Sequence, residues 1–215
     1  MEILYIDDSL VLVNKPPGVA TVPGGWGEVV PSAIELLEAD LGHLWIVHRL
    51  DKVTSGIVLF ARTAEAHRAL SMLFERREVR KTFDALICGV PAWDEHTARH
   101  NLRTDVGHRH RTVVDHSRGI SAVTNFRVLE RFTSFSLLEA TTETGRIHQV
   151  RAHAAALGFP LLADTLYGAP DTEFIPRPAL HACSLSFRFK EKSFSFTAPY
   201  PKDFDQALIN LGAVK

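Results

Sequence analysis

The chain has 215 residues, of which 46% are hydrophobic and 23% are charged, and its formal net charge is −1. These values are ordinary for a soluble globular protein, and a near-neutral charge gives no general attraction to nucleic acid. No apolar run reaches membrane-spanning length, and the acidic start MEILYIDDSL does not resemble a signal peptide. Cys88 and Cys183 form neither a CxxC motif nor a zinc spacing, so we interpret them as reduced core residues of a cytoplasmic protein.

The order of apolar and turn-forming segments predicts strands joined by hairpins, with a few helices between them. We expect strands within residues 3–18 (two, on either side of Asp7-Asp8), 57–62, 81–89, 121–132, 135–143 and 185–199 (a hairpin), and helices at 31–41, 64–76 and 146–158. This order favours an α+β fold with a mixed, mostly antiparallel central sheet and flanking helices. Because no linker divides the chain, we expect a single catalytic domain over residues 1–215.

Capping and turn residues add detail to four segments. Ser32 is the expected cap of the first helix, and the last hairpin is expected to turn near residues 190–192. Residues 92–119 are polar and rich in histidine, which indicates an extended loop or a hairpin. The glycine-rich stretch TVPGGWGEV at 21–29 has no following Gly-Lys-Ser/Thr, so it is not a phosphate-binding loop.

The helix expected at 146–158 carries an arginine at the edge of its apolar face. The apolar stripe consists of Ile147, Val150, Ala154 and Leu157, and Arg151 borders it. An arginine at this place keeps its charge and needs an anion or a route to water. Asp51 is a plausible anion, and a purely structural salt bridge explains the same residues at least as well.

The stretch VHRLDKVTSGIVLFAR, residues 47–62, holds a carboxylate shortly before a strand that is expected to be buried. Residues 57–60 are continuously apolar, so the turn Thr54-Ser55-Gly56 must deliver the chain straight into a core. Asp51 lies between His48-Arg49 and this turn. It is therefore either a turn-forming residue or a catalytic group.

Segments spread over nearly the whole chain resemble the RluA-like RNA pseudouridine synthases, in the expected order. HRLDKVTSGIVLFAR resembles the catalytic signature of this family, and TGRIHQVRAHAAALGFPLLADTLYG resembles its second long motif. LVNKPPGVATVPG, VRKTFDALICG, and LHACSLSF with FTAPYPKDF resemble the N-terminal, middle and C-terminal segments. Because Met1 to Val13 already resembles the catalytic domain, we expect a short form without the N-terminal RNA-binding domain that the family often carries.

The resemblance implies a cofactor-free isomerisation of RNA, in which uracil is detached from C1′ through N1, rotated and rejoined through C5. Asp51 is then the catalytic nucleophile or an equivalent covalent participant, and Arg151 pairs with it and keeps it ionised. Arg49 resembles the residue that enters the gap left by the flipped-out base. Arg146 and the basic residues near 76–81 and 99–111 are candidates for phosphate contacts. On charge alone, the interpretation of these two clusters as solvated loops is favoured.

Phe83 departs from the family pattern, which usually has tyrosine at this position. That tyrosine stacks on the target base and is often proposed to take the C5 proton. Phe83 keeps the stacking face and lacks the hydroxyl, so a mechanism with a tyrosine base is in doubt for this chain. Leu180 is a weaker candidate for the opposite face of the uracil.

Other interpretations find less support in the sequence. The histidines at 96, 100, 108, 110 and 116 have no standard metal-site spacing, so we expect no metal. The HRLD segment lacks every other kinase element, and a hydrolase would need a partner acid or a metal for Asp51. The rival hypothesis is a catalytically silent RNA-binding protein on the same fold, suggested by Phe83. We expect a cytoplasmic monomer whose partner is tRNA or rRNA with a flipped-out uridine, without cofactor or membrane attachment.

Overall fold

The strands and helices that the sequence predicts are largely present in the structure, a computed structural model that describes residues 1–24, 30–107 and 110–212. The chain divides into two units: Met1–Lys81 with Ala182–Pro201, and Thr82–His181 with Lys202–Lys215. Both units combine helices with antiparallel strands, which confirms the α+β class. That residues 1–215 act as one catalytic domain stays a prediction.

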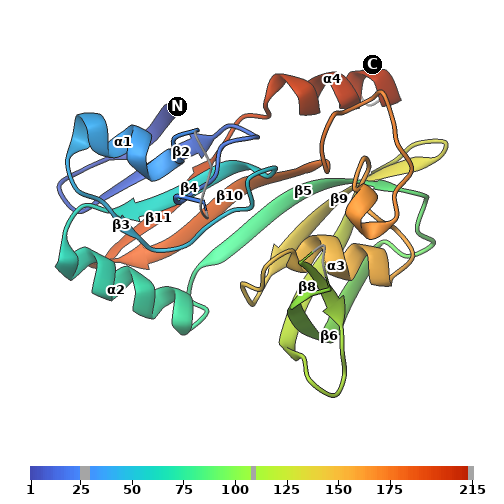
Figure 1. The fold of residues 1–215 in the computed structure, drawn as a ribbon, viewed down its shortest axis with the longest axis horizontal. Coiled ribbons are helices and arrows are strands. Elements are labelled where there is room, and N and C mark those ends of the chain that lie inside the picture. The colour runs from blue at the N-terminus through green and yellow to red at the C-terminus, as the bar shows by residue number, and fades with distance from the viewer. Residues whose placement is uncertain (25–29, 108–109, 213–215) are drawn as a thin grey trace. The chain divides into compact units, whose positions relative to one another are not determined.

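The first unit is a sheet with two helices (Figure 1). Its strands follow the order β1-β2-β4-β10-β11, and the short β3 pairs with β4. The β1–β2, β2–β4, β3–β4 and β10–β11 pairs are antiparallel. The bounds are β1 Glu2–Ile6, β2 Leu10–Lys15, α1 Ala33–Leu41, β3 Trp45–Ile46, β4 Ser55–Ala61, α2 Ala64–Glu75, β10 Leu180–Phe189 and β11 Lys192–Thr197.

The central strands β2 and β4 are buried on both faces, which is why their sequences are continuously apolar rather than alternating. On one face, Leu12 and Leu59 pack in a cluster with Leu70 of α2. Figure 1 shows α1 and α2 on opposite sides of these strands. The helix α1 buries Ile34 and Leu37.

Both helices of the first unit begin at side-chain caps. Ser32 and Glu35 form a capping box at α1: the Ser32 N–H donates to the Glu35 carboxylate at 2.8 Å, and the Ser32 hydroxyl accepts the Glu35 N–H. Thr63 caps α2 by accepting the N–H of Ala66 at 3.1 Å. The predicted Ser32 cap is therefore confirmed. The predicted turn of the last hairpin is also confirmed, and its two residues Lys190 and Glu191 have φ values of 47° and 63°, as a tight hairpin turn requires.

The second unit has five strands in the order β5-β9-β8-β6-β7, covered by α3. Its β9–β8, β8–β6 and β6–β7 pairs are antiparallel. The polar, histidine-rich residues form the β6–β7 hairpin, one of the two alternatives predicted; His108 and Arg109 lie outside the described residues. The helix α4 was not predicted. The bounds are β5 Arg80–Cys88, β6 Glu95–Val106, β7 Arg111–Val114, β8 Ile120–Arg131, β9 Phe135–Thr142, α3 Gln149–Ala156, a 3₁₀ turn at Thr165–Tyr167 and α4 Lys202–Leu211.

The third helix differs from its prediction in length and in burial. It begins at Gln149 rather than at residue 146, because His148 adopts a left-handed conformation with φ 53° and ψ 22°. Ile147 therefore precedes the helix and is 45% exposed, so it does not belong to an apolar stripe. Gln149 to Ala154 are all buried, because neighbouring elements cover the helix on more than one side. Arg151 thus lies inside the second unit, not at the edge of a stripe.

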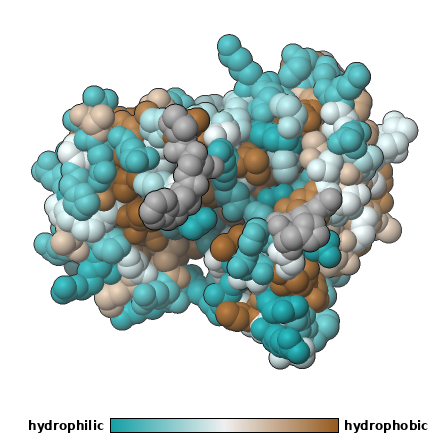
Figure 2. Space-filling model, in the orientation of Figure 1, coloured by the Kyte–Doolittle hydropathy of each residue, from teal (hydrophilic) through white to brown (hydrophobic). Residues whose placement is uncertain are grey.

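The surface carries no single extended apolar region on the face drawn in Figure 2, where hydrophobic residues form separate patches among hydrophilic ones. None of the helices in the described part of the chain is long and apolar enough to cross a membrane. Cys88 and Cys183 form no disulfide within the described residues, and each is half-buried, so their predicted place in the core is wrong. Burial raises the pKa of the Cys88 thiol.

His153 is expected to make the stability of the protein dependent on pH. It is fully buried, and desolvation, followed by repulsion from His100, lowers its pKa to about 4. Between that value and the unfolded value near 6.5, the unfolded chain binds the extra proton. The free energy of unfolding should therefore fall as the pH drops from about 6.5 to about 4, by up to about 1.4 kcal/mol per pH unit from this group.

Urea unfolding of the wild type and of His153→Gln over this pH range measures the effect. The stability curve of the variant should be shallower than that of the wild type, since the titrating group is gone. Parallel curves would show that His153 does not carry this pH dependence.

Candidate active site

His48 of the HRLD segment attaches the start of the signature loop, residues 47–54, to β4. Strand β3 pairs with β4 through Ile46, and the next contact is made by a side chain: the Leu59 N–H donates to Nε2 of His48 at 3.0 Å. The imidazole stacks on Phe74 of α2, with ring centroids 4.8 Å apart. Desolvation, aided by repulsion from Lys81, lowers the pKa of His48 to about 3. The ring is therefore neutral, as an acceptor nitrogen must be.

The residues on either side of Asp51 are fixed by an earlier segment of the chain. The Thr21 hydroxyl donates to the Leu50 carbonyl at 2.9 Å and accepts the Leu50 N–H at 3.0 Å. The carbonyl of Lys52 accepts the N–H of Gly18 at 2.8 Å and the Lys15 ammonium at 3.4 Å. These hydrogen bonds hold the backbone around Asp51, whose own side chain is half-buried.

Gly56 explains the glycine of the Thr-Ser-Gly turn. Its φ is 114°, a value that side chains rarely tolerate, and a Cβ atom there would lie 2.3 Å from the carbonyl oxygen of Ala182 in β10. The preceding Thr54 and Ser55 are buried. The turn therefore requires glycine so that β4 can pack closely against β10. This packing fixes the point at which the signature loop joins β4.

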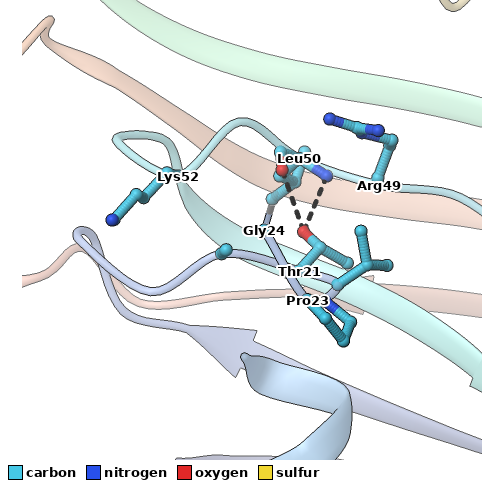
Figure 3. A pocket seen from close by; sticks show the side chains of 8 residues that line it. Thr21, Pro23, Gly24, Arg49, Leu50 and Lys52 are labelled. Carbon is cyan, nitrogen blue, oxygen red and sulfur yellow. Dashed lines mark hydrogen bonds between the residues drawn. The ribbon is translucent and has the colours of Figure 1, made fainter. Parts of the chain in front are cut away.

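A pocket of about 300 Å³ lies between the signature loop and the segment that holds it (Figure 3). Figure 3 shows the two hydrogen bonds of Thr21 to Leu50, and Arg49 and Lys52 projecting from the loop on either side. Arg49 is exposed. The pocket is lined by Ala20, Thr21, Val22, Pro23, Gly24, Arg49, Leu50 and Lys52. It combines two basic side chains with a partly apolar wall.

In the second unit, Gln149 fixes the loop that carries Arg146. Its amide oxygen accepts the Thr144 hydroxyl at 2.7 Å and the Arg146 N–H at 3.1 Å. Its amide nitrogen donates to the Val123 carbonyl and the Thr124 hydroxyl. Both the oxygen and the nitrogen of this buried amide are therefore hydrogen-bonded. Nε of Arg146 is buried without a hydrogen-bond partner among the described residues. A buried guanidinium nitrogen in this state is suited to an anionic ligand.

Arg151 forms a buried, bidentate ion pair with Asp164. Nε lies 2.7 Å from Oδ2, and Nη2 lies 2.8 Å from Oδ1. The two side chains are 6% and 0% exposed. Asp51 was predicted as a plausible anion for Arg151, with a structural salt bridge as the alternative, and Asp164 was not predicted. Asp51 belongs to the first unit and Arg151 to the second, and their pairing stays a prediction.

Phe83 and Leu180, the two predicted faces of a uracil site, belong to one apolar cluster of the second unit. Leu180 is buried and Phe83 is half-buried. Their contact with a base stays a prediction. Among residues 1–24, 30–107 and 110–212, no three His, Cys, Asp or Glu side chains lie so as to hold a metal ion.

Residues 9–156 match the model of the RNA pseudouridylate synthase family, which is more than half of the chain. The chain belongs to this family. It is 36% identical over 203 residues to the dual-specificity RNA pseudouridine synthase RluA of Pasteurella multocida, and the match covers 93% of each protein. It is 35% identical to the ribosomal large subunit pseudouridine synthase D of Neisseria meningitidis, with 94% of this chain and 59% of that protein covered.

A solved structure, the human RNA pseudouridylate synthase domain containing 4, has the same fold. Its TM-score is 0.79 at 27% identity, and the match covers 98% of this chain and 92% of that one. The resemblance to the RluA-like synthases is therefore confirmed, and so is the enzyme class.

Four residues with clear roles in the synthase were missed from the sequence: Thr21, His48, Gln149 and Asp164. All four lie inside the quoted motifs, so a signal was present. His48 and Gln149 form hydrogen bonds that position the backbone. No characteristic sequence spacing reveals a role of this kind. The sequence signal for Asp164 is clearer than the signals for the other three residues. A carboxylate directly after the apolar run in FPLLAD needs a buried partner.

The hydroxyl of Thr21 should be necessary for the stability of the signature loop. Thr21→Val keeps the shape and leaves the buried N–H and C=O of Leu50 without their partner. We expect the free energy of unfolding to fall by about 2 kcal/mol, within the range for unsatisfied buried groups. Thr21→Ser keeps the hydroxyl and is the matched control. Equal stability of the two variants in urea unfolding would show that the hydroxyl contributes little.

Proposed function

We propose that this synthase isomerises specific uridines in tRNA, large-subunit rRNA or both, with Asp51 as the catalytic nucleophile. The observation that carries the proposal is the signature loop itself: Asp51 is half-buried, and the backbone on both sides of it is held by hydrogen bonds. A nucleophile gains from such fixed positioning. The relatives named above act on RNA, and the name of one refers to the large ribosomal subunit.

The reaction needs a bond at C1′ to break and another to form at the same carbon. In our proposal the Asp51 carboxylate attacks C1′ of the ribose, and uracil leaves through N1. The uracil rotates in the site, its C5 then attacks C1′, and the carboxylate is released. The proton on C5 is lost and N1 gains one, so the product is an isomer of the substrate. No step requires a redox or metal cofactor.

Access to a uridine in folded RNA requires that the nucleotide leave its stack. Arg49 is exposed beside Asp51 in sequence, which suits a side chain that fills the gap left by the base. Arg146, with its buried and unpartnered Nε, suits a phosphate contact. Phe83 and Leu180 are proposed to hold the two faces of the extruded uracil, and Arg151 is proposed to pair with Asp51.

The alternative of a silent RNA-binding protein rests on Phe83, which has no hydroxyl. The intact signature favours the enzyme, because a protein that only binds RNA would not need the Asp51 carboxylate. The choice between tRNA and rRNA, the cytoplasmic location and the monomeric state remain predictions. Mapping of pseudouridines in total RNA with and without the protein identifies the substrate and tests the proposed function directly.

Asp51→Asn should fold and bind RNA while its turnover falls by several orders of magnitude. The amide is nearly the same size, and it is a far weaker nucleophile than a carboxylate. The measurement is release of tritium from RNA labelled at C5 of uridine, on the RNA identified by mapping. Asp40→Asn, an exposed acid of the same unit, is the control and should leave turnover unchanged. Turnover of Asp51→Asn close to wild type would refute the assignment.

Phe83→Ala should reduce turnover by about one to two orders of magnitude, because stacking on an aromatic ring contributes about 1–3 kcal/mol per base. Phe83→Tyr tests the proton acceptor. We expect this variant to be neutral or slower, since the added hydroxyl needs a partner that the site was not built to supply. A several-fold rise of its single-turnover rate would instead favour a hydroxyl as the acceptor of the C5 proton.

A further inference from the structure

The guanidinium of Arg151 is held by residues to which the reaction described above gives no role. Asp164 binds it side-on through Nε and Nη2, at 2.7 and 2.8 Å. A guanidinium has five N–H donors, and the side-on pair engages two of them. The pair therefore fixes the orientation of the Arg151 guanidinium.

Tyr167 supports the same guanidinium by its ring. The Arg151 guanidinium carbon lies 5.1 Å from the centroid of the Tyr167 ring. The far end of the ring is also fixed, because the Tyr167 hydroxyl accepts the Thr112 N–H at 2.9 Å and lies 3.2 Å from Nδ1 of His148. The ring therefore cannot swing away from Arg151 without breaking these contacts.

Asp164 is itself attached to the sheet of the second unit. Its N–H donates to the Leu161 carbonyl, and its carbonyl accepts the N–H groups of Tyr167 and Ala169. The neighbouring Leu162 donates to Leu86 of β5 at 2.8 Å. The carboxylate thus has a position set by β5, and through it the position of Arg151 is set as well.

A pair of this kind is poor evidence for stability alone. Two apolar side chains of similar volume can replace a buried ion pair at no cost or with a gain, whereas loss of one partner is strongly destabilising. An unrestrained arginine also has considerable rotamer freedom, about 2 kcal/mol. A chain that keeps both charges and adds an aromatic support gains a fixed guanidinium.

We infer that Asp164 and Tyr167 are positioning residues for catalysis: they hold Arg151 in the one orientation from which it serves the catalytic carboxylate. This inference rests on the proposed function and on the proposed role of Arg151 in it. It assigns to the DTLYG segment a part in the rate of the reaction rather than in RNA binding.

The test compares single-turnover rates at saturating RNA with the dissociation constant for the same RNA. Asp164→Asn should lower the rate by about 10- to 100-fold, the loss expected when a reacting group is misplaced by about 1 Å, and should leave the dissociation constant within about threefold. In an Arg151→Lys background, which cannot form the side-on pair, the same substitution should cost much less. Glu139→Gln removes a bidentate pair with Arg127 on the surface of the same unit, and its rate should match wild type.

Tyr167→Leu keeps the test decisive if Asp164→Asn does not fold, since it removes the ring and leaves the ion pair. It should fold, lower the rate and leave RNA binding intact, and Tyr167→Phe should lose less. A rate within twofold of wild type for a folded variant of Asp164 or Tyr167 would overturn the inference. So would a loss confined to RNA binding, or an undiminished effect of Asp164→Asn in the Arg151→Lys background. Absence of pseudouridine formation by the wild type would instead overturn the proposed function, and the inference with it.

Discussion

The signature loop depends on a lysine whose ammonium group is buried. Lys15 has no exposed surface, and its Nζ donates to the carbonyls of Pro16 and Val19 at 3.0 and 2.8 Å and to that of Lys52 at 3.4 Å. A buried ammonium is tolerated only when acceptors surround it, so the chain around it has to fold back. This requirement joins the loop after β2 to the loop after β3. Thr21 and Gly18 then complete the attachment, and the conformation around Asp51 follows.

In the second unit, the loops are also fixed by buried polar side chains, each of which has several donors or acceptors. Gln149 satisfies two groups of the loop before α3 and two groups of β8. Arg151, Asp164 and Tyr167 form a second connected set. Fully satisfied buried networks specify one arrangement, because any shift leaves a polar group unpaired. Each unit thus fixes its part of the chemistry by buried polar groups rather than by surface charge. The near-neutral net charge of an RNA-modifying enzyme is consistent with this.

Much of the fold could be predicted because apolar runs and capping residues are local signals. The Ser32 cap, the strand before residue 62 and the turn at Lys190-Glu191 all follow from neighbouring residues. The start of α3 could not be predicted in this way, because the left-handed conformation of His148 depends on contacts with distant residues such as Tyr167. For the same reason Asp164 escaped: its partner is thirteen residues away, across a helix end and a loop. The residues of the candidate site were predicted mainly from the family motifs. The contacts of the residues that hold them in place were seen only in the structure.

The steric condition at Gly56 separates positions that can be varied in the laboratory from positions that cannot. No side chain fits there, because the backbone of Ala182 occupies the space. Thr21 is also constrained, because its hydroxyl forms two hydrogen bonds with the backbone of Leu50. Ala20, Val22 and Pro23 line the neighbouring pocket, and none of their side chains contributes to those hydrogen bonds. A combinatorial library that randomises these three codons and keeps Gly56 and Thr21 constant would therefore vary the wall of this pocket while most of its members still fold.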